Sequence, residues 1–290
     1  MKTYSDYLNR FFPGRKIQKI SVDAGFSCPN RDGTISYGGC TYCRNDSFTP
    51  TYCNSLDSIK LQLQKGKDFF SRKYPEMKYL AYFQSYTGTH GKDPESLKKI
   101  YLEAMETEEI VGIVVATRPD SIPLETVRIL ADLNRDKPVF IEIGAETSHD
   151  ETLRIINRNH RWEDVVETTG RLAAHNLHCG IHLIAGLPGE SEEMILETVS
   201  KTLLLPIETI KLHQLQILFG TEMHRQWEKG LCHPTIYEID QYKNLCRKII
   251  QLVPDHIVIE RFLSQSPPEL VAAPKWGIKN YQFMNMLKTH

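Results

Sequence analysis

Short apolar segments alternate with amphipathic segments along most of this 290-residue chain. A parallel sheet covered by helices buries both kinds of segment, because each crossover between parallel strands needs a long, usually helical connection. The pattern predicts six strands at residues 17–23, 79–84, 112–117, 139–144, 179–184 and 209–215, and helices at 55–74, 94–106, 123–133, 150–156, 162–175 and 192–204. Six units are fewer than the eight of a closed barrel, so we predict an α/β fold in the form of a partial (β/α)6 TIM-like barrel.

The end of the chain is less periodic than the rest. Residues 258–262 form one further apolar run, and proline-rich stretches follow it. We therefore expect a core barrel over residues 1–232, including an N-terminal segment, and a C-terminal extension over residues 233–290 that packs on the barrel.

Composition narrows the class of protein. Hydrophobic residues make up 41% of the chain, charged residues 24%, and the formal net charge is −1, which is ordinary for a globular protein. The sequence contains no apolar run of membrane-spanning length and no apolar core of a signal peptide near Met1. We expect a cytoplasmic protein with no membrane partner, in which the seven cysteines bind metal or pack in the core rather than form disulfides.

Three of those cysteines share one glycine-rich segment directly after the first predicted strand. Eleven residues separate Cys28 from Cys40, and two separate Cys40 from Cys43. Three thiolates on a cubane iron–sulfur cluster leave one iron open for another ligand, which predicts an enzyme built around such a cluster. Two alternatives stay open: a structural zinc site with Cys53 as the fourth ligand, or unrelated buried cysteines. We expect Cys179, Cys232 and Cys246 to be small core residues; all three lie in apolar or helical surroundings.

Further short motifs follow the cysteines along the chain. They are Phe83-Gln-Ser-Tyr-Thr, Ala116-Thr-Arg-Pro-Asp, Asn157-Arg-Asn-His, Gly186-Leu-Pro-Gly-Glu, Lys211-Leu-His-Gln-Leu and Ala273-Pro-Lys-Trp. With the cysteine segment they resemble the radical S-adenosylmethionine (SAM) superfamily, and within it the YhcC/YtqA-like (MnmL-like) subgroup, which is related to the radical SAM half of the elongator catalytic subunit. The long first gap departs from the common CxxxCxxC spacing but is similar to that of the subgroup.

The resemblance implies roles for individual residues. Cys28, Cys40 and Cys43 would ligate a [4Fe–4S] cluster, SAM would chelate its fourth iron, and Arg158 would pair with the SAM carboxylate. Glu146 stands where the family usually has Gln. The expected cofactor-binding residues are Gln84, Ser85, Tyr86, Glu142, Gly144, Glu146, Arg158, His182 and Gly186, and the possible substrate-facing residues are Thr117, Arg118, His213 and Gln216. His213 and Gln216 are three positions apart, which predicts that at most one of them faces the barrel interior.

The resemblance also implies an activity. A reduced cluster would cleave SAM to methionine and a 5′-deoxyadenosyl radical, which abstracts a hydrogen atom from the substrate. The implied substrate is tRNA, with the carboxymethylaminomethyl group on C5 of wobble 2-thiouridine converted to aminomethyl. Expected partners are tRNA, an electron donor such as flavodoxin or ferredoxin, and a tRNA methyltransferase that acts downstream.

Two other functions stay open, a radical SAM enzyme on a small molecule or protein, and a non-catalytic zinc-stabilised RNA-binding protein. The sequence offers two groups of residues for RNA contacts. Basic residues precede the cysteine segment at Arg15, Lys16 and Lys19 and follow it at Lys60, Lys65, Lys67, Arg72, Lys73 and Lys78, and the aromatic candidates are Tyr37, Tyr42 and Phe48.

Overall fold

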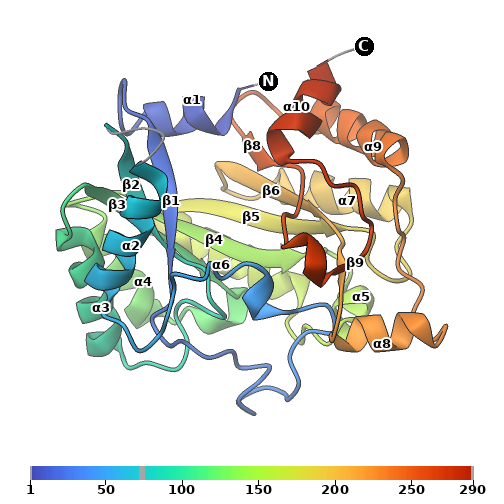
Figure 1. Ribbon diagram of the computed structural model, residues 1–290, viewed down its shortest axis with the longest axis horizontal. Coiled ribbons are helices and arrows are strands. Elements are labelled where there is room, and N and C mark those ends of the chain that lie inside the picture. Colours follow the sequence, from blue (N-terminus) through green and yellow to red (C-terminus); the bar gives the residue numbers. More distant parts are fainter. Residues whose placement is uncertain (1, 72–75, 289–290) are drawn as a thin grey trace.

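The computed structural model describes residues 2–71 and 76–288. In this part of the chain, a seven-stranded sheet runs in the order β1-β2-β3-β4-β5-β6-β8, with every neighbouring pair parallel. Its strands are β1 (Ile17–Val22), β2 (Lys78–Phe83), β3 (Ile110–Thr117), β4 (Val139–Glu146), β5 (His178–Ala185), β6 (Thr209–Gln214) and β8 (Val258–Arg261). The sheet curls into a half barrel (Figure 1), which confirms the predicted fold class.

Helices cover the outer face of this sheet. They are α2 (Ile59–Ser71), α3 (Pro94–Glu106), α4 (Leu124–Leu133), α5 (Asp150–Ile155), α6 (Trp162–Ala174), α7 (Glu192–Thr202) and α9 (Ile239–Leu252). Helix α3 shows how the sequence sets a boundary: the Asp93 side chain accepts a hydrogen bond from the Ser96 amide, and Pro94 occupies the first turn. The apolar faces of the helices and the outer sheet face form one large buried cluster.

The remaining elements flank the barrel. Helix α1 (Tyr4–Asn9) lies beside β8, and α10 (Asn280–Lys288) packs on α9. Two short antiparallel strands, β7 (Ile217–Leu218) and β9 (Val271–Ala273), pair with each other, and α8 (Glu222–Glu228) contacts β7. Three 3₁₀ turns complete the described chain at η1 (Asn45–Ser47), η2 (Pro119–Ser121) and η3 (Pro268–Leu270).

The six predicted strands are present, and the run at residues 258–262 adds β8 as a seventh strand paired with β6. The helix predicted at residues 55–74 begins later, at Ile59, because the Ser58 hydroxyl accepts from the Leu61 amide and caps the helix there. Residues 72–74 of that prediction lie outside the described residues. Helix α1 was not predicted; its six residues are too few for a periodic pattern, and Thr3 and Asp6 form its capping box.

An ion pair joins the two edges of the half barrel. Lys19 on β1 lies 2.8 Å from Glu260 on β8, and these strands are the first and last of the sheet. The Tyr4 ring of α1 lies under the Lys19 ammonium, 4.7 Å from centroid to nitrogen. The interior is therefore bounded at this level by charged side chains and by helix α1.

Candidate active site

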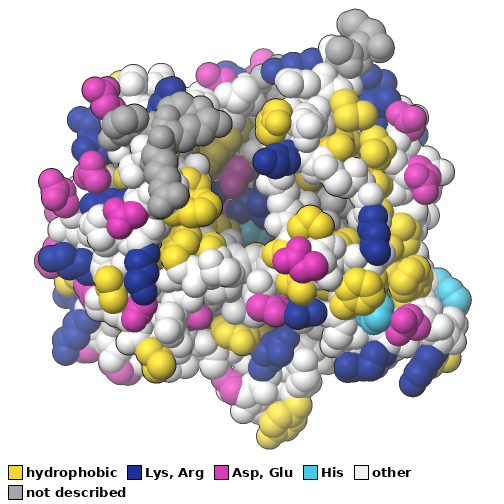
Figure 2. All heavy atoms as spheres, viewed as in Figure 1, with side chains coloured by type: hydrophobic (Ala, Val, Ile, Leu, Met, Phe, Trp, Pro, Cys, Tyr) yellow, Lys and Arg dark blue, Asp and Glu magenta, His cyan; other side chains and the backbone are white. Residues whose placement is uncertain are grey.

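A cavity of about 810 Å³ opens inside the half barrel and extends to the loops at the carboxyl ends of the strands. Figure 2 shows its mouth as a hollow near the centre of this face, with acidic and basic side chains inside it. Cavities of this size suit a cofactor and part of a substrate. The predicted site residues that line it are Cys28, Cys40, Cys43, Gln84, Tyr86, Thr117, Arg118, Glu142, Gly144, Glu146, Arg158, His182, His213 and Gln216.

The three cysteines sit on the loop between β1 and η1, which the α5–α6 connection holds in place. Asn30 donates to the carbonyls of Asn157 and Arg158 at 2.6 and 3.0 Å, and Asn157 in turn donates to the Gly39 carbonyl at 2.8 Å. Gly39 has φ +80°, and a Cβ there would lie 2.8 Å from Arg31 Nε. The glycine thus allows the backbone to pass close to an arginine beside the thiols.

The thiols of Cys28, Cys40 and Cys43 all face one cavity. Burial, and then the neighbouring Cys40, raise the pKa of Cys43 to about 11, while Arg31 acts in the opposite direction. All three thiols line the same cavity, and a cationic iron–sulfur core there would stabilise their ionised forms. The residues present therefore fit such a cluster.

The four-cysteine zinc alternative does not form in the described structure. Cys53 does not line the cavity; its thiol donates to the Ser21 carbonyl at 3.1 Å. Within residues 2–71 and 76–288, no three His, Cys, Asp or Glu side chains are grouped to hold one metal ion. A cubane cluster has a different requirement, because each thiolate ligates a separate iron and the sulfurs need not surround one point.

Arg158 lines the cavity beside the Cys40 thiol. Its Nη2 atom donates to the Gly144 carbonyl at 2.6 Å and lies 3.3 Å from Glu146 Oε1, while its Nη1 atom lies 3.9 Å from Cys40 Sγ. The buried Nε atom has no partner in the structure. A register shift at the end of β4 and a positive φ of 65° at Glu146 accompany this arrangement. An unpaired guanidinium N–H beside the thiols suits an anionic group such as a carboxylate.

Of the three expected cofactor-binding residues that follow β2, two line the cavity and one does not. Gln84 lines the cavity and donates to Ser21 Oγ and to the Phe48 carbonyl, both at 2.7 Å, which leaves its oxygen as an acceptor. Tyr86 also lines the cavity; its φ is +57°, and the residue is 41% exposed. Ser85 does not line it, because its side chain is buried beside Thr49.

Thr117 ends β3, Arg118 follows it, and both residues line the cavity. Arg118 forms two hydrogen bonds to Asp120, at 2.8 and 2.6 Å, and one to the Arg158 carbonyl at 2.8 Å. Its buried Nη1 atom has no partner. Thr117 shares its hydroxyl with Thr89 at 2.6 Å. Arg118 thus supports the Arg158 backbone and still offers one donor.

Glu142, which was expected to bind the cofactor, lies in the middle of β4 and not at the carboxyl end of that strand. Its carboxylate is 2.5 Å from Lys19, 2.7 Å from Lys211, 2.7 Å from His182 and 2.6 Å from the Tyr82 hydroxyl. Burial would raise the pKa of Glu142, but Lys19, Lys211 and His182 outweigh it and hold the pKa well below its usual range. These neighbours satisfy the carboxylate, so it acts as the hub of a buried charged cluster.

The two lysines of this cluster were not predicted as site residues. Lys19, which the sequence placed in a basic group for phosphate contact, is turned into the barrel between Glu142 and Glu260. Lys211 pairs with the same two carboxylates at 2.7 and 3.4 Å, and burial lowers the pKa of Lys211 to about 8. A usable signal was present, since a charged residue in the middle of an apolar strand of a covered sheet must face a partner.

Of the remaining expected residues, His182, His213 and Gln216 line the cavity, and Gly186 does not. His213 and Gln216 both line the cavity, and the prediction that at most one would do so is wrong because β6 ends at Gln214 and strand alternation stops there. Gly186 does not line it: a Cβ there would lie 2.5 Å from the Thr235 carbonyl, so this glycine serves close packing against the C-terminal segment. His182 donates toward Glu142 within the charged cluster.

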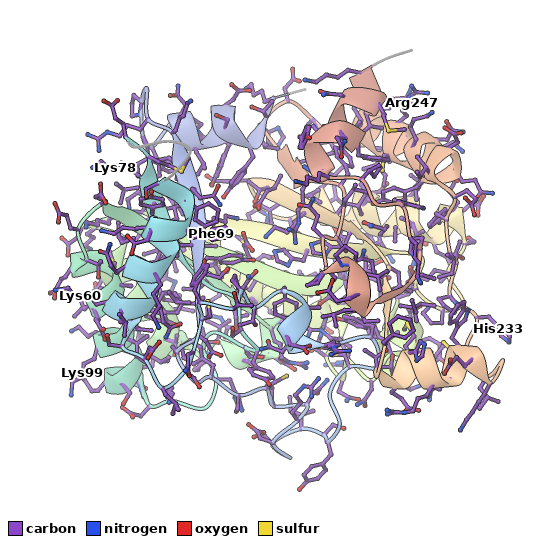
Figure 3. The ribbon with its side chains drawn as sticks, viewed as in Figure 1. Lys60, Phe69, Lys78, Lys99, His233 and Arg247 are labelled. Atoms are coloured by element: carbon purple, nitrogen blue, oxygen red, sulfur yellow. The ribbon has the colours of Figure 1, made fainter. Side chains whose placement is uncertain are left out.

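The basic residues after the cysteine loop are largely paired. Lys65 lies 2.6 Å from Asp57, and both Lys67 and Lys78 contact Glu109. Figure 3 labels Lys60 and Lys78 on the α2 side of the molecule, with Phe69 nearer the centre. Arg72 and Lys73 lie outside the described residues. This group therefore offers less free positive charge than its composition indicates.

Among the described residues, no helix is both long and apolar enough to cross a membrane.

Comparison with known proteins identifies the family to which a chain with these cysteines and this fold is similar. Residues 34–202 match the radical SAM superfamily domain, and residues 207–290 match the radical SAM C-terminal domain. The chain is 34% identical to YtqA of Bacillus subtilis (strain 168) over 98% of its own length and 87% of that protein. It is 35% identical to YhcC of Escherichia coli (strain K12) over 91% of its length and 83% of that protein.

Proteins with lower sequence identity to this chain include a tRNA-modifying enzyme and a solved archaeal structure. The tRNA uridine(34) acetyltransferase of Dehalococcoides mccartyi (strain CBDB1) is 28% identical over 59% of this chain and 36% of that protein. The solved structure of the archaeal Elp3 of Methanocaldococcus infernus, with an N-terminal deletion, superposes with a TM-score of 0.64 at 17% identity, over 94% of this chain and 63% of that one, which shows a shared fold. The chain thus belongs to the radical SAM superfamily, in its YtqA/YhcC-like family, whose members use a [4Fe–4S] cluster and SAM.

Proposed function

We propose that this protein is a radical SAM enzyme that modifies tRNA at the C5 side chain of the wobble 2-thiouridine, converting carboxymethylaminomethyl to aminomethyl. The observation that carries the radical SAM part is one cavity that is lined by three cysteine thiols and by Arg158, whose buried Nε atom has no partner and whose Nη1 atom lies 3.9 Å from Cys40 Sγ. The tRNA part is supported by the similarity to a tRNA uridine(34) acetyltransferase, which spans 173 residues of alignment.

Cys28, Cys40 and Cys43 would hold the cluster, and Arg158 would pair with the carboxylate of SAM through its free donor. Gly144 and Glu146 lie beside that arginine, where a backbone carbonyl and a carboxylate can accept from hydroxyls or an ammonium group. When bound, the cluster and SAM supply a 5′-deoxyadenosyl radical that abstracts a hydrogen atom from the substrate.

The protein's own part is to bind, orient and exclude water. The Lys19–Glu142–Lys211 cluster and Tyr4 of α1 form the floor of the cavity. A buried, hydrogen-bonded polar floor of this kind keeps its shape, because moving one member leaves the others unpaired. The reacting carbon is thereby presented from one direction, the mouth.

Two exposed aromatic side chains stand at that mouth. Phe48 is 39% exposed and Tyr86 is 41% exposed, and both line the cavity. Single-stranded RNA bases that leave their stack are commonly held on aromatic faces. Tyr37, on the cysteine loop, is 76% exposed and offers a third face outside the cavity.

The first test is anaerobic reconstitution of the protein with iron and sulfide, then dithionite and SAM, and measurement of 5′-deoxyadenosine. We expect product from the wild type, none from Cys40→Ala, and wild-type cluster content in Cys53→Ala, the matched control whose thiol lies outside the cavity. Stoichiometric zinc in place of iron, lost in Cys53→Ala, would overturn the radical SAM assignment.

The second test uses tRNA from cells that accumulate carboxymethylaminomethyl-2-thiouridine, with nucleosides analysed by mass spectrometry. Aminomethyl-2-thiouridine formed only with reductant, SAM and intact Cys40 would support the substrate. The physiological electron donor would be a flavodoxin or ferredoxin, and a tRNA methyltransferase would act on the product. Formation of 5′-deoxyadenosine without any change in the tRNA would favour a small-molecule or protein substrate instead.

A further inference from the structure

The cavity carries more positive than negative side chains, although the whole chain has a net charge of −1. Five of its lysines and arginines are matched by a carboxylate in an ion pair. These are Lys19 with Glu142 and Glu260, Lys211 with the same two, Arg44 with Asp46, Arg118 with Asp120, and Arg158 with Glu146.

Two cavity arginines of the described chain, Arg31 and Arg261, form no ion pair. Arg31 lies beside the thiols, donates to the Cys43 carbonyl at 3.0 Å, and would be balanced by thiolate charge. Arg261, at the end of β8, has no such counterpart. Its surplus charge lies deeper in the half barrel, where Arg261 is the register partner of Lys211 on β6.

A neutral histidine holds Arg261 in place. Its Nη2 atom donates to His213 Nε2 at 3.1 Å, and its Nε atom is buried without a partner. Burial, and after it the charge of Arg261, keep the pKa of His213 well below its usual range, so this imidazole accepts the hydrogen bond and does not neutralise the arginine. The His213 ring stacks on His182 at 5.6 Å, which fixes its orientation.

Gln216, which lines the same cavity, has an unpaired hydrogen-bond acceptor, whereas the unpaired atom of Arg261 is a donor. Gln216 Oε1 is buried and lacks a hydrogen-bond partner. A buried donor and a buried acceptor without partners each carry a free-energy cost that a ligand can remove. A group that combines an anion with an N–H donor would satisfy both.

We propose that Arg261, held by His213, forms an anion subsite in this cavity that binds a carboxylate carried by the side chain of the substrate. A guanidinium whose Nε–H group has no partner suits a carboxylate, and in a low-dielectric site this pair is stronger than at the surface. The inference rests on the proposed function only in that the substrate enters this cavity. Arg261 would then allow the protein to bind a substrate side chain that carries a carboxylate in preference to the same side chain without one.

The test begins with small probes, so that it does not depend on RNA. Reconstituted protein with SAM is titrated with N-methylglycine, with dimethylamine (the same amine without a carboxylate) and with inorganic phosphate, and binding is followed by ligand-observed saturation-transfer NMR. We expect saturable binding of N-methylglycine alone, lost in Arg261→Gln and kept in Arg225→Gln, an exposed arginine outside the cavity that pairs with Glu222. Arg261→Lys, which keeps the charge, should recover part of the binding.

The second arm uses anticodon stem–loops whose wobble 2-thiouridine carries either carboxymethylaminomethyl or aminomethyl. Wild-type protein should bind the first about tenfold or more tightly, and Arg261→Gln should bind the two equally. No N-methylglycine signal, equal binding of phosphate, or an unchanged RNA preference in Arg261→Gln would overturn the carboxylate subsite. Binding of N-methylglycine with no binding of either RNA would instead reject the tRNA substrate and leave the subsite standing.

Discussion

Replacement of Glu142 by Gln should destabilise the protein by an amount that the charged cluster predicts. The cluster is balanced as folded, with two lysines, Lys19 and Lys211, against two carboxylates, Glu142 and Glu260. Glu142→Gln keeps the volume and removes one negative charge. Lys19 then still has Glu260 at 2.8 Å, but Lys211 is left with Glu260 at 3.4 Å.

The cost is that of a buried charge deprived of its main partner. Side-chain exposure is 3% for Lys211 and 6% for Glu142, so solvent screens the pair little. Breaking such a pair from one side costs about 3–5 kcal/mol, or a fall in Tm of roughly 5–10 °C for a chain of this size. Lys211 can reduce this cost by releasing its proton, so the loss should be largest below pH 8 and smaller above it.

The assay is anaerobic thermal unfolding of cluster-loaded protein, followed by far-UV circular dichroism. It compares wild type, Glu142→Gln, Lys211→Met and the double variant, in which charge is balanced again. We expect the double variant to be more stable than Glu142→Gln, since the uncompensated ammonium is gone. If the two single effects simply add, or if Glu142→Gln costs less than about 1 kcal/mol, the reasoning from charge balance is wrong.

Two further predictions follow from the same geometry. The pKa of Lys211 is about 8 in the folded protein against an ordinary 10.5. Between these pH values the unfolded chain binds more protons than the folded protein, so the free energy of unfolding should rise with pH. We expect wild type to gain about 3 kcal/mol relative to Lys211→Met between pH 7.5 and 10.5, measured by urea unfolding. An unchanged difference across that range would contradict the assignment. In Gly144→Ala, the new Cβ would lie 2.6 Å from Arg158 Nη2 and 2.8 Å from Glu146 Oε1, so SAM should bind the reconstituted protein about tenfold more weakly. Gly170→Ala, which meets nothing within 4 Å, should leave SAM affinity unchanged, and equal affinities in the two variants would argue against Arg158 as the SAM contact.

Local pattern was sufficient for most of the architecture. The apolar runs that became β1 to β6 are recognisable because a strand covered on one face by helices and on the other by a packed interior is apolar along most of its length. The cysteine segment was recognisable for a similar reason, since ligand spacing is local in the chain. Arg158, Gln84 and Tyr86 were placed by resemblance to a family, and the structure brings them to the cavity with the thiols.

Other parts of the site had an incomplete local signature, because a charged residue within an apolar strand indicates a buried partner but does not identify it. Glu142, Lys19, Lys211 and Glu260 come from four strands spread over the whole chain, and their pairing depends on how far the sheet curls. Strand alternation also misplaced Gln216, because only the folded chain shows where β6 stops.

The sequence by itself determined that strands and helices alternate in a parallel sheet and that three thiols follow the first strand. These features depend on residues close together in the chain, where hydrophobic period and ligand spacing act directly. Tertiary structure alone decided which cation stays unpaired. Arg261 and Lys211 occupy facing positions on neighbouring strands, yet only Lys211 reaches a carboxylate. Charge pairing acts over a few ångströms in space, and that proximity exists only once distant strands have been brought together.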